Sequence, residues 1–531
     1  MTCPPTDRRP ARDYWVLIML ILAALAYRLI TTQMIETGGD AVYKWSLAMR
    51  AAEYPVPVFP AGNHHSARMS INYVAYAFQQ IFGTHPIVYY FPAYLMSVVQ
   101  VVFVFLFCRR AGGLWPAVLA AVALILHPQL VRHGAQLLPA VFSGAYVMGA
   151  LYFLSRCFEP RAGSIAINRT LAALFFFLAY MAKVPNLFFL PALVLGVWAI
   201  RRDWRDVLSF LGLLFVLLAL EWVFYILTQG HFLGRLGAVQ NQIGVSPEII
   251  LSMLPSEAQP LDWFDLFRYR YSPRFLGGLT TASMFYVSLA SAIYLIWRLR
   301  RLASSEALIS TALLCYVILA GAAVRGLDPL VPFQGFIPRY LVVLVPLSMT
   351  AVAIVVADIA TLIGRRLAPQ GAASIVKIVV IAVLILPVLW AFHERNHRYY
   401  VLSVETHPYT ALSEYVSTVN DAAADCVPFI LEQRGAESAL KQVFLKDFYR
   451  VAGGVRGDAK PYSVGFAQTC ADRYPDLNSY FSKIGGATEI DAVWVSRYDT
   501  TGRRNWTIER KPIPVSLLIE HFASKTPPDD E

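Results

Sequence analysis

The chain has 531 residues, of which 57% are hydrophobic and 15% are charged. A soluble domain carries about 25% charged residues, so most of this chain is not exposed to water. Ordinary numbers of glycine (31) and proline (32) and only 6 cysteines exclude collagen-like and disulfide-scaffold proteins. The net charge is +10, yet residues 393–531 contain 16 basic and 19 acidic residues. The basic excess therefore lies in the hydrophobic part, where it indicates membrane orientation rather than nucleic-acid binding.

Eleven apolar stretches are predicted to cross a membrane as helices, because a span needs about 20 mostly apolar residues. They are 14–34, 86–108, 113–131, 138–155, 170–183, 185–200, 207–228, 275–297, 306–324, 340–362 and 375–392. Segment 69–82 is apolar but too short to cross, which favours a helix at the membrane interface. The predicted fold class is a mainly α, polytopic membrane bundle.

The loops between these spans divide into two kinds. Those on one side are short and rich in arginine, whereas the other side has long loops at 35–85 and 229–274. The positive-inside rule then places the tail 1–13 in the cytoplasm and the C-terminal part outside. Arginine far outnumbers lysine, which favours a bacterial inner membrane. The clustered arginines are Arg8, Arg9, Arg12, Arg109, Arg110, Arg156, Arg161, Arg169, Arg201, Arg202, Arg205, Arg298, Arg300, Arg301, Arg365 and Arg366.

The composition changes after residue 392. Residues 14–392 form the predicted transmembrane domain, and 393–531 alternate helix-like stretches with strand-like ones such as 491–495. We therefore predict a small extracytoplasmic α/β domain at the C-terminus. It contains Cys426 and Cys470, the only cysteines of the predicted exterior. An oxidising compartment permits a disulfide between them, and the sequence leaves both states open.

The first long outer loop carries the residues best suited to acid–base chemistry. Two glycines precede Asp40, and this turn would place a carboxylate just above the bilayer. His64, His65 and Arg68 follow in the same loop and are weaker candidates for acceptor or donor contacts. Such a group could bind and deprotonate a polar acceptor. The alternative interpretation is a hydrated loop with no chemical role.

Two cations at predicted outer helix ends could bind a phosphate. Lys183 lies beside Pro185 between two short spans, and Arg339 precedes Tyr340 at the head of a late span. The alternative is that both side chains only reach from the helix ends to the interface. Arg28 and Glu221 fall within spans at comparable depth, and we expect them to pair.

No metal site is predicted. His64 and His65 are adjacent, rather than at the i, i+4 spacing that places two ligands on one helix face. A divalent metal bound by Asp40 and a histidine is the weaker alternative. No cofactor is expected.

Over residues 14–392 the pattern resembles the GT-C class of membrane glycosyltransferases. The closest likeness is to the family of dolichyl-phosphate-mannose protein mannosyltransferases and the bacterial lipid A aminoarabinose transferase. The elements that carry the resemblance are Asp40 early in a long outer loop, the Phe82-Gly83 passage, the Lys183-Val184-Pro185 junction and Pro338-Arg339-Tyr340.

This resemblance implies sugar transfer from a polyprenyl-phosphate donor to a lipid, glycan or protein acceptor outside the membrane. Asp40 would be the catalytic base and would give inversion, and Lys183 and Arg339 would bind the donor phosphate. Gly39 and Ala41 flank Asp40, where the family often has a second acid, and residues 132–139 lack an acid often seen there.

Two other functions fit the composition. The first is a secondary transporter or flippase for a lipid-linked or anionic substrate, although such folds show two similar halves and mid-depth charges that this sequence lacks. The second is a non-catalytic subunit whose outer domain binds a partner.

Overall fold

The computed structural model describes most of residues 10–399 and several parts of the C-terminal region. The described residues are 10–32, 40–51, 59, 65–84, 86–158, 165–230, 232–235, 262–273, 276, 279–298, 304–327, 330–332, 341–367, 373–399, 418, 421–422, 424–431, 448–450, 463–467, 470, 473, 477–484, 486–496 and 507–516. The chain forms two compact units. The first comprises residues 1–31, 56–74 and 91–402, and the second comprises 32–55, 75–90 and 403–531.

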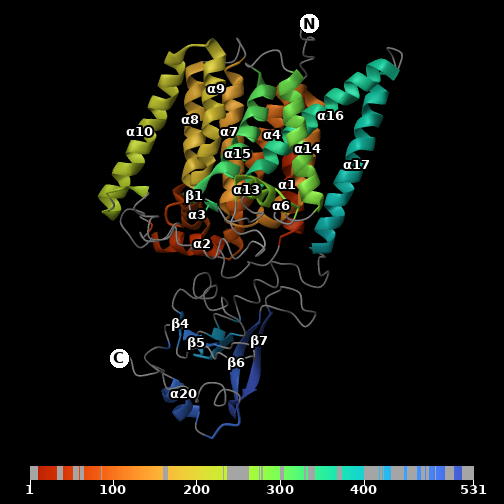
Figure 1. Ribbon diagram of the computed structural model, residues 1–531. Helices are drawn as coiled ribbons and strands as arrows, with labels where there is room; N and C mark the ends of the chain where they lie inside the picture. The colour runs from red at the N-terminus through yellow and green to blue at the C-terminus, as the bar shows by residue number, and fades with distance from the viewer. Residues whose placement is uncertain are drawn as a thin grey trace. The chain divides into compact units, whose positions relative to one another are not determined.

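The first unit is a helical bundle (Figure 1). Its helices are α1 (Pro10–Ile30), α4 (Phe91–Gly112), α5 (Leu114–Leu126), α6 (Pro128–His133), α7 (Pro139–Arg156), α8 (Ile165–Ala182), η2 (Val184–Phe189), α9 (Leu190–Arg201), α10 (Trp204–Gln229), α13 (Trp263–Arg270), α14 (Leu279–Arg298), α15 (Ser305–Ala322), η5 (Val342–Leu344), α16 (Val345–Leu367) and α17 (Ala373–Tyr399), with a hairpin of β1 (Val324–Leu327) and β2 (Leu330–Pro332). A helix lies at each of the eleven predicted spans. The mainly α fold class is confirmed.

Eight helices of the described chain are long and apolar enough to cross a membrane. They correspond to α1, α4, α8, η2 with α9, α10, α15, η5 with α16, and α17. Helix α5 is apolar but shorter, and α7 and α14 are not among the eight. The count of eleven spans therefore stays a prediction. Helix α17 continues to Tyr399, beyond the predicted end of the transmembrane domain at residue 392.

Helix α7 forms the core of the bundle. Fifteen of its 18 residues are buried, and it packs against α4 and α8. Gly149 allows this close approach, because a Cβ there would lie 2.5 Å from Phe175 Cδ1. In contrast, α10 and α17 lie on opposite flanks (Figure 1) and expose many large apolar side chains, as expected of helices that face lipid.

Charged residues form pairs at the predicted cytoplasmic helix ends. Arg109 Nε lies 2.7 Å from Asp13 Oδ2, and Arg169 pairs with Asp206 at the starts of α8 and α10. Burial raises the pKa of the Cys157 thiol to about 11, and the positive charges of Arg169, Arg110 and Arg156 oppose this shift. Arginines from separate loops are therefore close enough to act on one thiol.

The second unit contains α2 (Asp40–Ala51), η1 (Pro86–Tyr90) and the C-terminal half of α3 (Met69–Phe82). Helix α3 has the bounds of the predicted interfacial segment. Trp45 of α2 is fully buried, its carbonyl accepts a hydrogen bond from Gln79 Nε2 at 3.0 Å, and its ring meets Tyr89 edge-on. These contacts join α2 to α3 and η1.

The same unit contains a five-stranded mixed sheet. Its order is β4 (Phe448–Arg450), β5 (Ser463–Ala467), β3 (Phe429–Leu431), β6 (Glu489–Ser496) and β7 (Thr507–Pro514). Strands β3 and β6 are parallel, the other neighbours are antiparallel, and α20 (Leu477–Ile484) precedes β6. The α/β character predicted for this region is confirmed.

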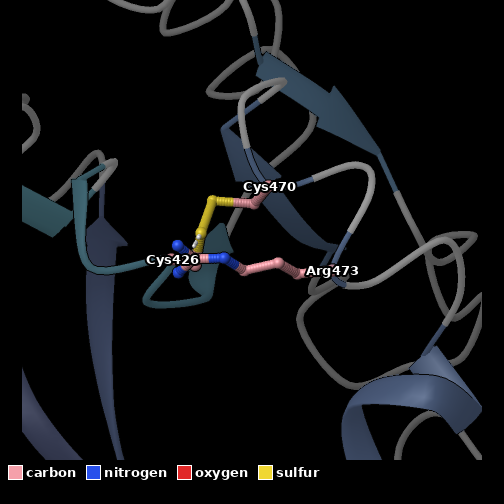
Figure 2. The surroundings of a disulfide bond; sticks show 3 residues. All are labelled: Cys426, Cys470 and Arg473. Atoms are coloured by element: carbon pink, nitrogen blue, oxygen red, sulfur yellow. Dashed lines mark hydrogen bonds between the residues drawn. A yellow bond between two sulfur atoms is a disulfide. The ribbon is translucent and has the colours of Figure 1, made fainter.

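The disulfide that the sequence left open is present. Cys426 and Cys470 are bonded, with Cα atoms 5.6 Å apart (Figure 2). Arg473 Nη1 donates to Cys426 Sγ at 3.6 Å. The bond closes a loop across the sheet, since Cys426 precedes β3 and Cys470 follows β5.

Candidate functional site

The candidate site is built around the break between α8 and η2. Pro185 lacks a backbone N–H, so α8 cannot continue through it. Lys183 is the residue at the break, with extended backbone (φ −163°, ψ 123°). Its N–H donates to Ala179 O at 3.0 Å, and its carbonyl accepts from Asn186 N–H at 3.0 Å. Lys183 is half-buried, and the predicted break between two helices is present, whereas its place at the outer face stays a prediction.

The last turn of α8 exposes carbonyls that no further helical turn can satisfy. Arg235 supplies two of the missing donors, and Ser70 and Asn186 add side-chain donors to carbonyls slightly earlier in the helix. Ser70 Oγ donates to Leu178 O at 2.9 Å, and Asn186 Nδ2 donates to Ala179 O at 2.6 Å. Arg235 donates through Nη1 to Tyr180 O at 2.9 Å and through Nη2 to Met181 O at 3.0 Å.

Arg235 makes three kinds of contact at once. Besides the two carbonyls, its guanidinium lies 4.7 Å from the Tyr180 ring centroid and 3.6 Å from Glu221 Oε1 of α10. Only 6% of Arg235 is exposed. Low polarity around the group strengthens each interaction. The cation of the loop after α10 is thus part of the α8–α10 interface.

The expected pair of Arg28 and Glu221 is wrong. Glu221 pairs with Arg235, and Arg28 donates through Nη1 to Ile125 O at the end of α5, at 3.1 Å. Similar depth in the bilayer places two charges at one level but does not place them on neighbouring helices. Arg235 was not predicted as the partner of Glu221. The sequence feature that could have indicated it is a cation shortly after the end of the span that carries this buried acid.

The turn before α3 is packed beside this junction. Asn72 Nδ2 donates to His65 O at 2.9 Å and to Ser66 O at 3.2 Å, and His65 and Ser66 are buried. Arg68 is half-buried. Because Ser70 contacts the last turn of α8, and Tyr146 OH of α7 donates to Ser70 O at 3.2 Å, the start of α3 adjoins the Lys183 junction.

A second buried cation lies near η2. Arg270 ends α13 and is 4% exposed, and burial lowers the pKa of its guanidinium. Arg270 lies close enough to Tyr316 of α15 to interact electrostatically with its ionised form. Tyr316 in turn stacks on Phe189 of η2, with ring centroids 4.6 Å apart. Arg270 was not predicted as a candidate, because it lies in a short amphipathic helix without an apolar run.

The remaining candidates are described only in part. Asp40 is the first residue of α2, whose backbone the structure describes. His64, Arg339 and Tyr340 lie outside the described residues. The convergence of Asp40 and Arg339 with Lys183 therefore stays a prediction. Within the described ranges, no three His, Cys, Asp or Glu residues form a group that could bind a metal ion.

Comparison with known proteins supports the resemblance. Residues 66–225, which include Lys183, match the family model of the dolichyl-phosphate-mannose-protein mannosyltransferases. No curated protein sequence matches the chain. Among solved structures, ArnT from Cupriavidus metallidurans bound to undecaprenyl phosphate has a TM-score of 0.51 at 13% identity, and the match covers 91% of this chain and 93% of ArnT.

Two further structures match less closely. The oligosaccharyltransferase from Archaeoglobus fulgidus has a TM-score of 0.44 at 14% identity, covering 72% of this chain and 53% of the other. The arabinosyltransferase EmbB from Mycobacterium smegmatis has 0.41 at 10%, covering 86% and 46%. This chain thus spans about half the length of these two proteins. The chain has the fold of the GT-C membrane glycosyltransferases and resembles the dolichyl-phosphate-mannose protein mannosyltransferase family over residues 66–225.

Proposed function

We propose that this chain is an inverting glycosyltransferase. It moves a sugar, a hexose or a pentose, from a polyprenyl-phosphate donor to an acceptor hydroxyl on the outer side of the membrane. The acceptor is a lipid, a glycan or a protein. The proposed location is a bacterial inner membrane, with the N-terminus in the cytoplasm and the C-terminal domain in the periplasm.

The observation that carries this proposal is the fixed position of Lys183. The lysine lies at the end of a membrane helix, and the side chains of Ser70, Asn186 and Arg235 donate to the carbonyls of residues 178–181 just before it. A merely solvated lysine needs no such support. A cation fixed at the membrane boundary suits the phosphate of a lipid whose chain lies in the bilayer.

The proposed chemistry needs one base and a cationic phosphate site. Asp40 takes the proton of the acceptor hydroxyl as its oxygen attacks the anomeric carbon, and the bond from that carbon to the phosphate oxygen breaks. The leaving group is a stable phosphate monoester dianion, so it needs positive charge and no general acid. Lys183 and Arg339 supply that charge. A single attack inverts the anomeric configuration.

Four residues have weaker proposed roles around the donor or the acceptor. His64, His65 and Arg68 belong to the segment that leads into α3, and Tyr340 follows Arg339. The contact of Ser70 with the end of α8 supports a place for Arg68 near Lys183. A side chain there would contact the sugar or the acceptor rather than the membrane.

The test is turnover of purified full-length protein with a panel of polyprenyl-phosphate sugars. We expect the wild-type protein to consume one of these sugar donors. Asp40→Asn should abolish transfer while the protein still binds that donor. Asp203→Asn is the matched control, because Asp203 is an exposed N-cap that accepts from Arg205 N–H, and asparagine caps a helix equally well. Near-normal turnover of Asp40→Asn would remove Asp40 from the mechanism.

Two further measurements test the phosphate site. Lys183→Ala is expected to weaken donor use with little effect on insertion, and an unchanged apparent donor affinity would reduce Lys183 to an interfacial lysine. The proposed step uses no metal, so treatment with EDTA should leave turnover unchanged. A loss of turnover that Mg²⁺ or Mn²⁺ restores would favour the alternative of a divalent metal bound by Asp40 and a histidine.

A further inference from the structure

We propose that Arg235 is a positioning residue that fixes the last turn of α8 and thereby the backbone from which Lys183 extends. This inference rests on the proposed role of Lys183 at the donor phosphate. In it Arg235 acts through Lys183 and does not itself contact the donor.

The contacts of Arg235 are concentrated on the residues just before Lys183. Its two terminal nitrogens donate to Tyr180 O and Met181 O, and the face of the guanidinium lies over the Tyr180 ring. Ala182 is the only residue between these carbonyls and Lys183. The amide of Lys183 closes the same turn by donating to Ala179 O. A shift of this turn would therefore carry Lys183 with it.

Arginine is suited to this place for reasons that lysine does not share. Its planar fork can donate to two carbonyls in one direction while its face lies on an aromatic ring. The ammonium of lysine could keep the ion pair with Glu221 but could not reproduce both the fork and the ring contact. A cation at the C-terminal end of a helix also interacts favourably with the helix dipole. Arg235→Lys thus keeps the charge and removes the geometry.

The buried setting makes these contacts costly to lose. Arg235 and Glu221 are both buried, and Tyr180 and Met181, whose carbonyls accept from Arg235, are half-buried. An unpaired carbonyl in such a place favours opening of the last turn. Because displacement of a ligand-binding group by about 1 Å can reduce a rate about 100-fold, even a small opening affects the phosphate site.

The first experiment measures the turn itself and needs no substrate. Hydrogen exchange of the amides of residues 180–184 and 186 is compared in full-length wild type, Arg235→Lys and Arg28→Lys. Arg28 is the matched control, because it is equally buried and also donates to a carbonyl at a helix end, Ile125 O. We expect exchange about tenfold faster in Arg235→Lys only. Unchanged exchange in that variant would overturn the proposal.

The second experiment is a double-mutant cycle with undecaprenyl phosphate as the probe. Arg235→Lys should raise the dissociation constant about tenfold in the wild-type background and leave it unchanged in the Lys183→Gln background. Equal effects in both backgrounds would mean that Arg235 binds the phosphate itself, and the positioning role would fall. If Lys183→Gln alone leaves binding unchanged, the proposed function of Lys183 fails, and the role of Arg235 fails with it even where exchange is faster.

Discussion

Asn186 donates a hydrogen bond from Nδ2 to Ser143 Oγ at 2.7 Å and another to Ala179 O at 2.6 Å. One fully buried amide thus joins three elements: η2, the N-terminal part of α7 and the last turn of α8. The bend at Lys183 therefore has a definite geometry against the core helix.

Replacing Asn186 should destabilise this bend. Asn186→Leu removes both hydrogen bonds and leaves Ala179 O without that donor, which predicts a loss of about 1–3 kcal/mol and a lower Tm in detergent. Ser143→Ala removes one partner only, and the amide retains Ala179 O, so a smaller decrease is expected. Equal melting temperatures for wild type and Asn186→Leu would contradict this account.

Gly149 tests the packing of α7 against α8. An added Cβ would lie 2.5 Å from Phe175 Cδ1 and 3.0 Å from Phe103 Cε2. The Phe175 ring has little room to move, because Phe103 and Phe153 flank it with centroids at 5.2 and 5.4 Å. Gly149→Ala is therefore expected to cost about 1–3 kcal/mol, measured as a lower Tm.

A glycine elsewhere supplies the control for Gly149→Ala. Gly212 of α10 has no heavy atom within 4 Å of an added Cβ, so Gly212→Ala should leave Tm unchanged or slightly raised. A similar decrease in both variants would show that helix geometry, and not the contact with Phe175, sets the effect.

The disulfide predicts how the C-terminal unit responds to reduction. Removing the Cys426–Cys470 bond, which closes a loop with a sequence separation of 44, is expected to cost about 2–4 kcal/mol. Cys426→Ser/Cys470→Ser should therefore show faster proteolysis of residues 403–531 without a change in the bundle. Cys157→Ser is the control, since Cys157 is a free thiol. Identical proteolysis of all three proteins would assign the disulfide no stabilising role.

The arginine-rich helix ends predict the orientation in the membrane. Alkaline phosphatase fused after Tyr399 should be active, because that enzyme needs an exterior location, and a fusion after Leu367 should be inactive. The reason is that short loops rich in arginine, such as the one at the end of α16, stay on the cytoplasmic side of the membrane. The reverse pattern of activities would invert the proposed topology and place the Lys183 junction in the cytoplasm.

Local features of the sequence predicted the helices well. Segment 69–82 became α3 with the same bounds, and the break at Lys183 lies where Pro185 predicted it. Both follow from information within a few residues: the length of an apolar run and the absence of an N–H in proline. The same holds for β6, which contains the predicted strand 491–495.

Pairing between distant segments was not predictable in this way. The short strands β3 and β4 have three residues each, and they form only because they hydrogen-bond to strands farther along the chain. Whether Cys426 is bonded to Cys470 depends on the distance between them in space, which their separation in the sequence does not give. Glu221 was assigned the wrong partner, because a helix position gives the depth of a charge but not the direction in which it points around the bundle.

The sequence by itself determined a membrane bundle, a C-terminal α/β region and a lysine at a helix break, and it predicts that the long loops lie on one side. These properties depend on hydrophobic length, charge bias and proline, which act locally. Only the tertiary structure decided that Ser70, Asn186 and Arg235 meet at the end of α8 and that Arg235 pairs with Glu221. The physical reason is that buried polar groups need partners, and at the end of α8 the chain satisfies that need through contacts between residues up to 108 positions apart.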